Sequence, residues 1–307
     1  MSAKKETPSD QQLHLAALQG NLEQLKRVID GGRVHVDCKD KEGTTPLILA
    51  AANNHLSCVK ELLDQGADPN ARRQTGTCAL FFAAQGGFLE IVQELISREA
   101  TVDLPSNDGG TPLFVACQCS HLDVVDELVS RGADVHIEMN DGASPLFIAA
   151  QNGHVRMLKY LLSKGAKVNQ RRKDKASPLW IASQMGHIPI VQALLEAGAE
   201  VDASREDGAT PLFKAAHKGH LDVVNELLKH GASVSVLENG ESALHAAALF
   251  GHGNVVRALI AAGVSPALKN KEGATAAELA KDAGYDLIAD FLNKARSTQT
   301  GSIQTTV

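Results

Sequence analysis

Apolar and polar residues along this chain follow the spacing of short amphipathic helices separated by turn residues. In one representative segment the apolar positions recur at intervals that place them on a single helical face. They are Leu221, Val223, Val224, Leu227 and Leu228, and Gly231 follows them. Because glycine just after such a pattern favours the end of a helix, the segment predicts a helix that ends before Gly231.

A shorter helix is predicted immediately before this one. Thr210 is suited to the N-cap of a helix and Pro211 to its first position, where the missing N–H costs nothing. Gly219 is suited to a left-handed C-cap at the other end. Ahead of this helix, the alternating run 199–202 and the turn signal Asp207-Gly208 predict a β-hairpin loop. Each repeat therefore consists of a helix, a turn, a second helix and a hairpin loop.

These elements recur along nearly the whole chain. A Thr-Pro-Leu or Ser-Pro-Leu triplet marks five repeats. Its leucine, together with Leu80, stands at positions 47, 80, 113, 146, 179 and 212, so every step is 33 residues. Extending the series in both directions predicts nine repeats. They are 6–39, 40–72, 73–105, 106–138, 139–171, 172–204, 205–236, 237–269 and 270–296, between a flexible N-terminus at 1–5 and a flexible tail at 297–307.

One repeat alone cannot bury enough apolar surface to offset the conformational entropy lost on folding, which is about 1.5 kcal/mol per residue. Stacked repeats supply the missing contacts to one another. The first repeat lacks the Thr-Pro-Leu triplet and the last has Ala276-Ala277 in place of Pro-Leu, so both are predicted to be caps. The expected fold is all-α, a solenoid of nine repeats that include two capping repeats.

Composition agrees with thin repeats built on alanine and leucine. Aromatic residues make up only 4% of the 307 residues, and hydrophobic residues make up 44%. The net charge of −6 comes from interspersed signs, which disfavours nucleic acid as a partner. The first residues are polar and the sequence has no long apolar run, so we expect neither a signal peptide nor a membrane span. Five cysteines favour free thiols in a reducing compartment. We expect an intracellular monomer, in the cytoplasm or alternatively the nucleus.

The repeats resemble the ankyrin repeat family. The run from Asp207 to Leu212, Asp-Gly-Ala-Thr-Pro-Leu, and the Gly-His pairs at 153–154, 186–187 and 219–220 carry the resemblance. It implies an ankyrin solenoid of paired helices and hairpin loops that has no catalytic site and needs no cofactor. It also implies the function of a scaffold or adaptor that binds protein partners.

The alternative is an enzymatic or metal-binding activity hidden in the array, and Cys117-x-Cys119-x-His121 is its best candidate. However, His121 occupies a position that histidine also fills in five other repeats, at 55, 154, 187, 220 and 252. No second cysteine pair completes a tetrahedral set of ligands. The chain also contains no phosphate-loop, zinc-protease or nucleophile-elbow motif. We therefore expect neither catalytic residues nor a metal site.

Five successive repeats carry an aromatic residue where ankyrin repeats commonly carry histidine after Thr-Pro-Leu. These residues are Phe81, Phe114, Phe147, Trp180 and Phe213. The structural interpretation is a row of rings packed between adjacent first helices. The functional interpretation is an aromatic floor for a partner. The neighbouring buried leucine of each triplet favours the structural interpretation.

A row near the C-terminal ends of the first helices is the leading candidate for a binding site. Four repeats place glutamine at one equivalent position, and other residue types continue the row. Its members are Gln85, Gln118, Gln151, Gln184, His217, Lys218, Leu249 and Phe250. The resemblance implies that these helix ends face the concave groove of the solenoid, so we expect them to contact a protein partner. The alternative is hydrogen bonding between neighbouring repeats.

The tail ends in Thr305-Thr306-Val307, which is similar to a class I ligand of PDZ domains. In such ligands the terminal carboxylate binds backbone N–H groups while the last side chain fills an apolar pocket. Val307 would fill that pocket, and the hydroxyl of Thr305 would reach a side-chain acceptor. A PDZ-domain protein is therefore a second predicted partner.

Overall fold

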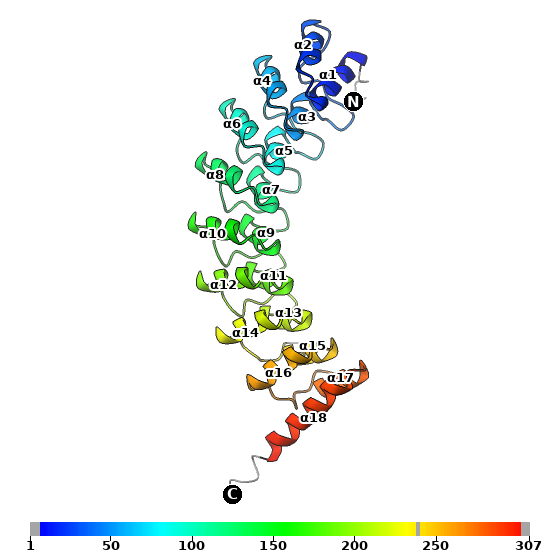
Figure 1. The fold of residues 1–307 in the computed structure, drawn as a ribbon, viewed down its shortest axis with the longest axis vertical. Coiled ribbons are helices and arrows are strands. Elements are labelled where there is room, and N and C mark those ends of the chain that lie inside the picture. Colours follow the sequence, from blue (N-terminus) through cyan, green and yellow to red (C-terminus); the bar gives the residue numbers. More distant parts are fainter. Residues whose placement is uncertain (1–6, 238–239, 302–307) are drawn as a thin grey trace. The chain divides into compact units, whose positions relative to one another are not determined.

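The computed structural model describes residues 7–237 and 240–301 as a succession of helices joined by turns and loops (Figure 1). Contacts within the chain define two compact bodies, and their boundary follows Ala149 inside helix α9. The N-terminal body comprises residues up to 149 together with 164–166. The C-terminal body comprises residues 150–163 and those from 167 onward.

The helices of the described residues come in pairs, as the sequence pattern predicts. The N-terminal body holds α1 (Pro8–Gln19), α2 (Leu22–Asp30), α3 (Pro46–Ala52), α4 (Leu56–Asp64), α5 (Ala79–Gly86), α6 (Leu89–Ser97), α7 (Pro112–Cys119) and α8 (Leu122–Ser130). Helix α9 (Pro145–Gln151) contains the boundary. The C-terminal body holds α10 (Val155–Ser163), α11 (Pro178–Met185), α12 (Ile188–Glu196), α13 (Pro211–Lys218), α14 (Leu221–Lys229), α15 (Ala243–Leu249), α16 (Gly253–Ala261), α17 (Ala276–Asp282) and α18 (Asp286–Gly301).

Each body is built from two rows of helices. In the N-terminal body α1, α3, α5 and α7 pack successively against one another, and α2, α4, α6 and α8 form the second row. The C-terminal body has the same arrangement, with α11, α13, α15 and α17 in one row and α10, α12, α14, α16 and α18 in the other. The cores consist mainly of small aliphatic side chains; Leu80, Ala83 and Ala84, for example, are completely buried. These small residues let consecutive first helices approach closely.

The predicted caps are present at the ends of the first helices. The hydroxyl oxygen of Thr111 accepts a hydrogen bond from the backbone N–H of Phe114 at 3.2 Å, and Pro112 occupies the first turn of α7. At the other end, Gly219 closes α13 with a left-handed backbone, φ +77°. These contacts satisfy N–H and C=O groups that a helix end otherwise leaves without partners.

The loops between repeats differ from the predicted β-hairpins. The prediction was wrong in expecting paired strands there. Within the described residues the sole strand-like pairing outside helices is one isolated bridge between Lys269 and Thr275. In the loop at 73–77 the Arg73 N–H donates to the Thr77 carbonyl at 3.0 Å. The next backbone donor, the N–H of Gln74, bonds the Glu42 carbonyl of the preceding loop at 2.9 Å. One backbone N–H closes the loop and the next bonds the preceding loop. Because these N–H groups do not pair two segments of the same loop in register, no strand ladder forms.

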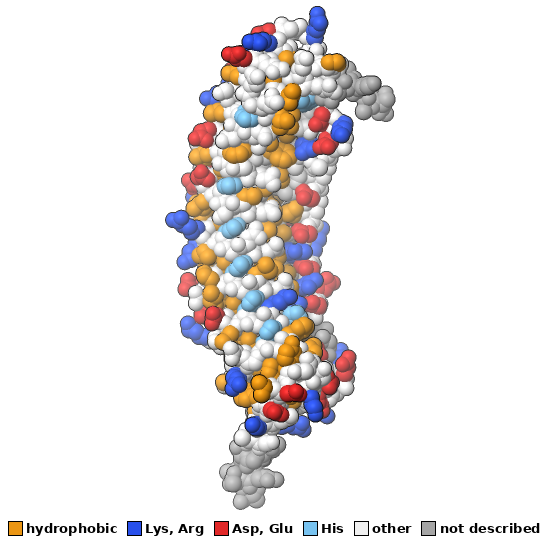
Figure 2. Space-filling view, turned by 45° about the vertical axis from the view of Figure 1, so that its right-hand side comes forward, with side chains coloured by type: hydrophobic (Ala, Val, Ile, Leu, Met, Phe, Trp, Pro, Cys, Tyr) orange, Lys and Arg blue, Asp and Glu red, His pale blue; other side chains and the backbone are white. Residues whose placement is uncertain are grey.

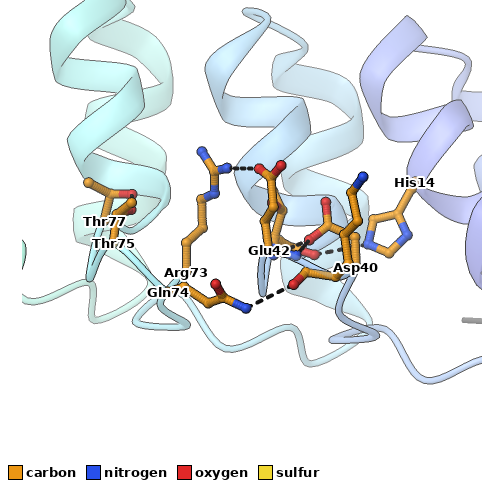
Figure 3. Close-up of polar contacts among 9 residues, drawn as sticks. His14, Asp40, Glu42, Arg73, Gln74, Thr75 and Thr77 are labelled. Carbon is orange, nitrogen blue, oxygen red and sulfur yellow. Dashed lines mark hydrogen bonds and ion pairs between the residues drawn. The ribbon is translucent and has the colours of Figure 1, made fainter. Parts of the chain in front are cut away.

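Side chains join these stacked loops as well (Figure 3). The amide Nε2 of Gln74 donates to the carbonyl oxygen of Lys41 at 2.8 Å, and Arg73 forms an ion pair with Glu42. The carboxylate of Asp40 accepts from the backbone N–H of Thr44 at 2.7 Å, which holds the preceding loop in shape. The loops thus form a continuous hydrogen-bonded edge to the helices within this body.

The last helix is longer than predicted, because α18 continues to Gly301 instead of ending at 296. The hydroxyls of Ser297 and Thr298 donate to carbonyl oxygens one turn earlier, at Asn293 and Ala295 respectively. These bonds satisfy the hydroxyls within the helix, and the next glycine comes at Gly301. Among the helices of residues 7–237 and 240–301, none combines the length and the apolar character that crossing a membrane requires.

Candidate functional site

The glutamine row lies at the ends of the first helices in both bodies. Gln85 in α5 and Gln118 in α7 are exposed on the N-terminal body. Gln151 in α9 and Gln184 in α11 are half-buried on the C-terminal body. All four glutamines thus lie near the C-terminal ends of the first helices, as expected.

Histidines from the following repeats use the backbone of this row. The Nε2 atom of His121 contacts the carbonyl oxygen of Gln85 at 3.0 Å, and His187 and His220 contact the carbonyls of Gln151 and Gln184 at the same distance. A carbonyl oxygen only accepts, so each Nε2 carries the donated proton. Hydrogen bonding between repeats therefore occurs through the main chain of the row.

The side-chain amides of the same residues remain available. In the part of the chain that the structure describes, the amides of Gln85, Gln151 and Gln184 have no hydrogen-bond partner. Gln118 does take part in an interaction within the chain. Three of the four glutamines thus present unused donors and acceptors at equivalent points of successive repeats.

The surroundings of Cys117, Cys119 and His121 do not favour the metal site that their spacing suggests. The Nε2 atom of His121 is engaged by Gln85, Cys117 is buried, and Cys119 is exposed at the end of α7. Burial raises the pKa of the Cys117 thiol, which disfavours the thiolate that a metal would require. Among the described residues, no group of three or more His, Cys, Asp or Glu side chains could hold a metal ion.

The end of the row in the C-terminal body has a different chemical character. The ring of His217 lies 4.4 Å from the ring of Phe250, measured between centroids, and 6.4 Å from that of Phe213. Leu249 is 40% exposed and Phe250 is 46% exposed, and Lys218 is also exposed. Figure 2 shows histidine, basic and hydrophobic side chains gathered together on this body. We call Lys214, His217, Lys218, Leu249 and Phe250 the α13–α15 face.

The aromatic row lies largely in the interior. Phe114, Phe147 and Trp180 are buried, with exposed fractions of 6%, 2% and 5%, whereas Phe81 and Phe213 are half-buried. The indole N–H of Trp180 donates to the carbonyl oxygen of Ala209 at 2.9 Å. The burial of these three rings supports the structural interpretation at their positions.

Lys214 is a further candidate residue of this site, which the repeat pattern did not single out. Its Nζ atom lies 5.4 Å from the centroid of the Trp180 ring, one repeat earlier. The guanidinium of Arg205 lies 5.4 Å from the same centroid. The 33-residue register places Lys214 beside Trp180, but register alone gives no direction for a flexible side chain.

Two groups of the α13–α15 face have lowered pKa values. Burial lowers the pKa of Lys214, and the positive charges of Arg205 and Lys218 add to the effect while Asp207 opposes it. Burial also lowers the pKa of His217, with further contributions from the charges of Lys214, Lys218 and His252. Both shifts show that burial and the neighbouring positive charges disfavour the protonated form of each group.

The predicted PDZ ligand cannot be placed on this surface. Thr305 and Val307 lie outside the described residues. It stays a prediction from sequence.

Comparison with known proteins identifies similar sequences along most of the chain. A family model described as "Ankyrin repeats (3 copies)" matches residues 5–73, 52–139, 131–205 and 198–270. Ankyrin repeat domain-containing protein 29 of Danio rerio is 50% identical over 74 residues, which are 24% of this chain and 25% of that protein. The protein of the same name from Homo sapiens is 52% identical over 73 residues, 24% of each chain. DNA-binding protein RFXANK of Homo sapiens is 40% identical over 70 residues, 23% of this chain and 27% of that protein. The match thus spans only about a quarter of each relative's length.

Proposed function

Since this chain belongs to the ankyrin repeat family, we propose that it is a non-catalytic scaffold that binds partner proteins through the ends of its first helices. Ankyrin repeats generally mediate protein–protein interaction, and stacked repeats present extended surfaces for this purpose. The observation that carries the proposal is that the backbone carbonyls and the side-chain amides of the glutamine row have different surroundings. Its carbonyl groups stabilise the stack through histidine, while the amides of Gln85, Gln151 and Gln184 have no partner among the described residues.

A row of amides without partners suits recognition of an extended protein segment. Each amide offers both a donor and an acceptor, as does each backbone peptide group of an extended chain. The shared repeat position gives regular spacing within each body. Removing the amides should therefore weaken partner binding without unfolding the helices, because their backbone contacts remain.

Proximity labelling of the full chain in cells, followed by in vitro capture, tests this function. Gln85, Gln151 and Gln184 would each be replaced by glutamate, and the control would place glutamate at Gln65, an exposed glutamine after α4 on the second row. We expect loss of labelled partners with the row variant and retention with the control. Unchanged capture by a row variant that is still folded would disprove binding through this row.

The C-terminal Thr305-Val307 pair supports a second proposed contact, with a PDZ domain. The interaction requires the carboxylate of Val307, so the direct test compares the full chain with a form that lacks Val307 against a panel of PDZ domains. Equal binding of the two forms would rule out this contact while leaving binding through the helix ends untouched.

We also propose that the chain acts as a monomer inside the cell, in the cytoplasm or the nucleus. Support comes from its five free cysteines, which are characteristic of a reducing compartment. Cell fractionation, together with light scattering of the purified chain, would test compartment and oligomeric state separately.

A further inference from the structure

Lys214 is a charged residue at an otherwise apolar repeat position. The equivalent residues of other repeats are Leu49, Val115, Ile148 and Ile181. Of these, Val115, Ile148 and Ile181 are buried. Lys214 itself is half-buried, with its ammonium group near the face of Trp180. A charge at this depth costs free energy unless an opposite charge or strong hydrogen bonds compensate for it.

No carboxylate forms an ion pair with Lys214 within the part of the chain that the structure describes, and the charge of Asp207 compensates for its charge only in part. The nearby carboxylates are committed to Arg205, whose Nε atom lies 3.2 Å from Asp174 and whose Nη1 atom lies 3.6 Å from Asp207. Neither Lys214 nor Lys218 forms an ion pair with a described residue. Since the two lysines stand four residues apart on α13, they lie on the same face of the helix.

The same face also carries a ring nitrogen without a hydrogen-bond partner and an exposed apolar surface. The Nδ1 atom of His217 is buried and has no hydrogen-bond partner among the described residues. Next to it, Leu249 and Phe250 expose apolar surface where the preceding repeat carries His217 and Lys218. Positive charge, a ring nitrogen and apolar area therefore lie together at the ends of α13 and α15.

We propose that the α13–α15 face binds an acidic segment of a partner protein, with a carboxylate on Lys214 and Lys218 and an adjacent aromatic or aliphatic side chain on Phe250 and Leu249. This inference rests on the proposed scaffold function and adds the chemistry of the partner. The carboxylate supplies the counter-charge that Lys214 lacks, and the apolar side chain covers surface that now faces water.

Nucleic acid fits this face less well than an acidic protein segment does. A continuous phosphate backbone needs a series of basic side chains. Here Arg205 is already paired, and Glu206 and Asp207 lie on the adjoining loop. The net charge of the chain, −6, would also repel a polyanion. One carboxylate beside an apolar side chain matches the two lysines without meeting this repulsion.

Selection of short random peptides on the immobilised full chain, followed by fluorescence anisotropy of the selected peptides, tests the proposal. We expect enriched peptides to combine Asp or Glu with a neighbouring Phe, Leu or Tyr. Lys214→Ile should weaken their binding about tenfold or more, because a charge-assisted contact is lost. Lys214→Arg should retain most of the affinity. A labelled single-stranded oligonucleotide serves as the nucleic-acid probe and should not bind at physiological salt.

The matched control is Lys229→Ile on α14, which removes an exposed lysine from the second row of helices. It should leave peptide affinity unchanged. Lys214→Ile introduces a residue that occupies the equivalent buried position at Ile148 and Ile181, so this variant should fold and be more stable than the parent chain. Loss of binding together with a gain in stability would distinguish a lost contact from unfolding.

The outcomes also distinguish this inference from the scaffold function. Enriched peptides that lack acidic residues, or that bind the Lys214→Ile variant equally well, overturn the inference and leave the scaffold function intact. Preferential binding of the oligonucleotide overturns it in favour of nucleic acid. If no peptide is enriched while the glutamine row captures partners in cells, the inference again fails alone. Failure of both experiments removes the scaffold function as well.

Discussion

The imidazole of His220 covers the α carbon of Gly186, the glycine that ends the first helix of the preceding repeat. A Cβ atom at Gly186 would lie 2.7 Å from two atoms of the His220 ring. The same ring contacts the carbonyl oxygen of Gln184 through Nε2 at 3.0 Å. Equivalent contacts join Gly87 to His121 and Gly219 to His252. The glycine is therefore required both by its backbone conformation and by its neighbour.

Gly186→Ala should destabilise the chain more than Gly198→Ala does. Both glycines have positive φ, +77° and +86°, so alanine costs roughly 1 kcal/mol of backbone strain at either place. Gly198 has open space around its α carbon, whereas Gly186 meets the His220 ring, which adds on the order of 1–3 kcal/mol of overpacking. Urea unfolding followed by circular dichroism measures both. Equal losses of stability would show that the histidine contact contributes nothing.

Replacing Lys175 with glycine should stabilise the chain. Lys175 has φ +64°, while the equivalent loop positions hold Gly142 and Gly208, also with positive φ. Relief of this strain is worth on the order of 1 kcal/mol, part of which the greater entropy of the unfolded glycine offsets. The control is Lys173→Gly in the same loop, where φ is not positive and stability should fall. The prediction is wrong if both variants shift the unfolding midpoint in the same direction.

The pKa of His217 predicts a loss of stability on mild acidification. Because the folded pKa lies below the ordinary value, the unfolded chain takes up a proton first as the pH falls through about 6.5. The contribution of His217 to the free energy of unfolding is therefore fully present above about pH 6.5. It is lost progressively as the pH falls from there to the pKa of the folded state. His217→Gln, which restores the residue type of the other repeats, should reduce the acid-side loss. Unfolding midpoints of parent and variant, compared between about pH 7.5 and 5.5, check this difference.

Thiol alkylation should distinguish neighbouring cysteines of α7. Cys119 is exposed, whereas Cys117 is buried and its pKa is raised by burial. The folded chain should react with a maleimide at Cys119 long before Cys117, and denaturant should abolish the difference. Peptide mass spectrometry after timed labelling locates the modified residue. Comparable rates in the folded chain would contradict the packing of α7.

Much of the fold could be predicted from sequence because its determinants are local. Thr111 and Pro112 mark a helix start by their own chemistry, and Gly219 marks an end, so the helix pairs followed from the 33-residue period. The hairpin loops could not be predicted equally well. The alternating run 199–202 is typical of a strand, but the N–H of Glu200 bonds the side-chain oxygen of Asn169 in the preceding repeat. A contact of this kind depends on stacking geometry, which the alternation of residues does not encode.

The candidate site shows a similar contrast. The glutamine row could be predicted because equivalent positions repeat along the chain. The contact between Lys214 and Trp180 depends on how a flexible side chain crosses from one repeat to the previous one. Likewise, the glycine of the Gly-His pairs suggested a C-cap, but the packing of each histidine on the glycine of the preceding repeat depends on how the repeats stack.

The hydrogen bonds that join neighbouring repeats have a consequence for folding speed. The bond between His55 and Leu18 spans 37 residues, and that between Asn169 and Gly198 spans 29. Within each body such separations stay close to the length of one repeat, however many repeats are stacked. Relative contact order therefore falls as repeats are added, and the entropic cost of closing each loop stays constant. A chain of this design can lengthen by duplication without a growing kinetic barrier to the docking of each new repeat.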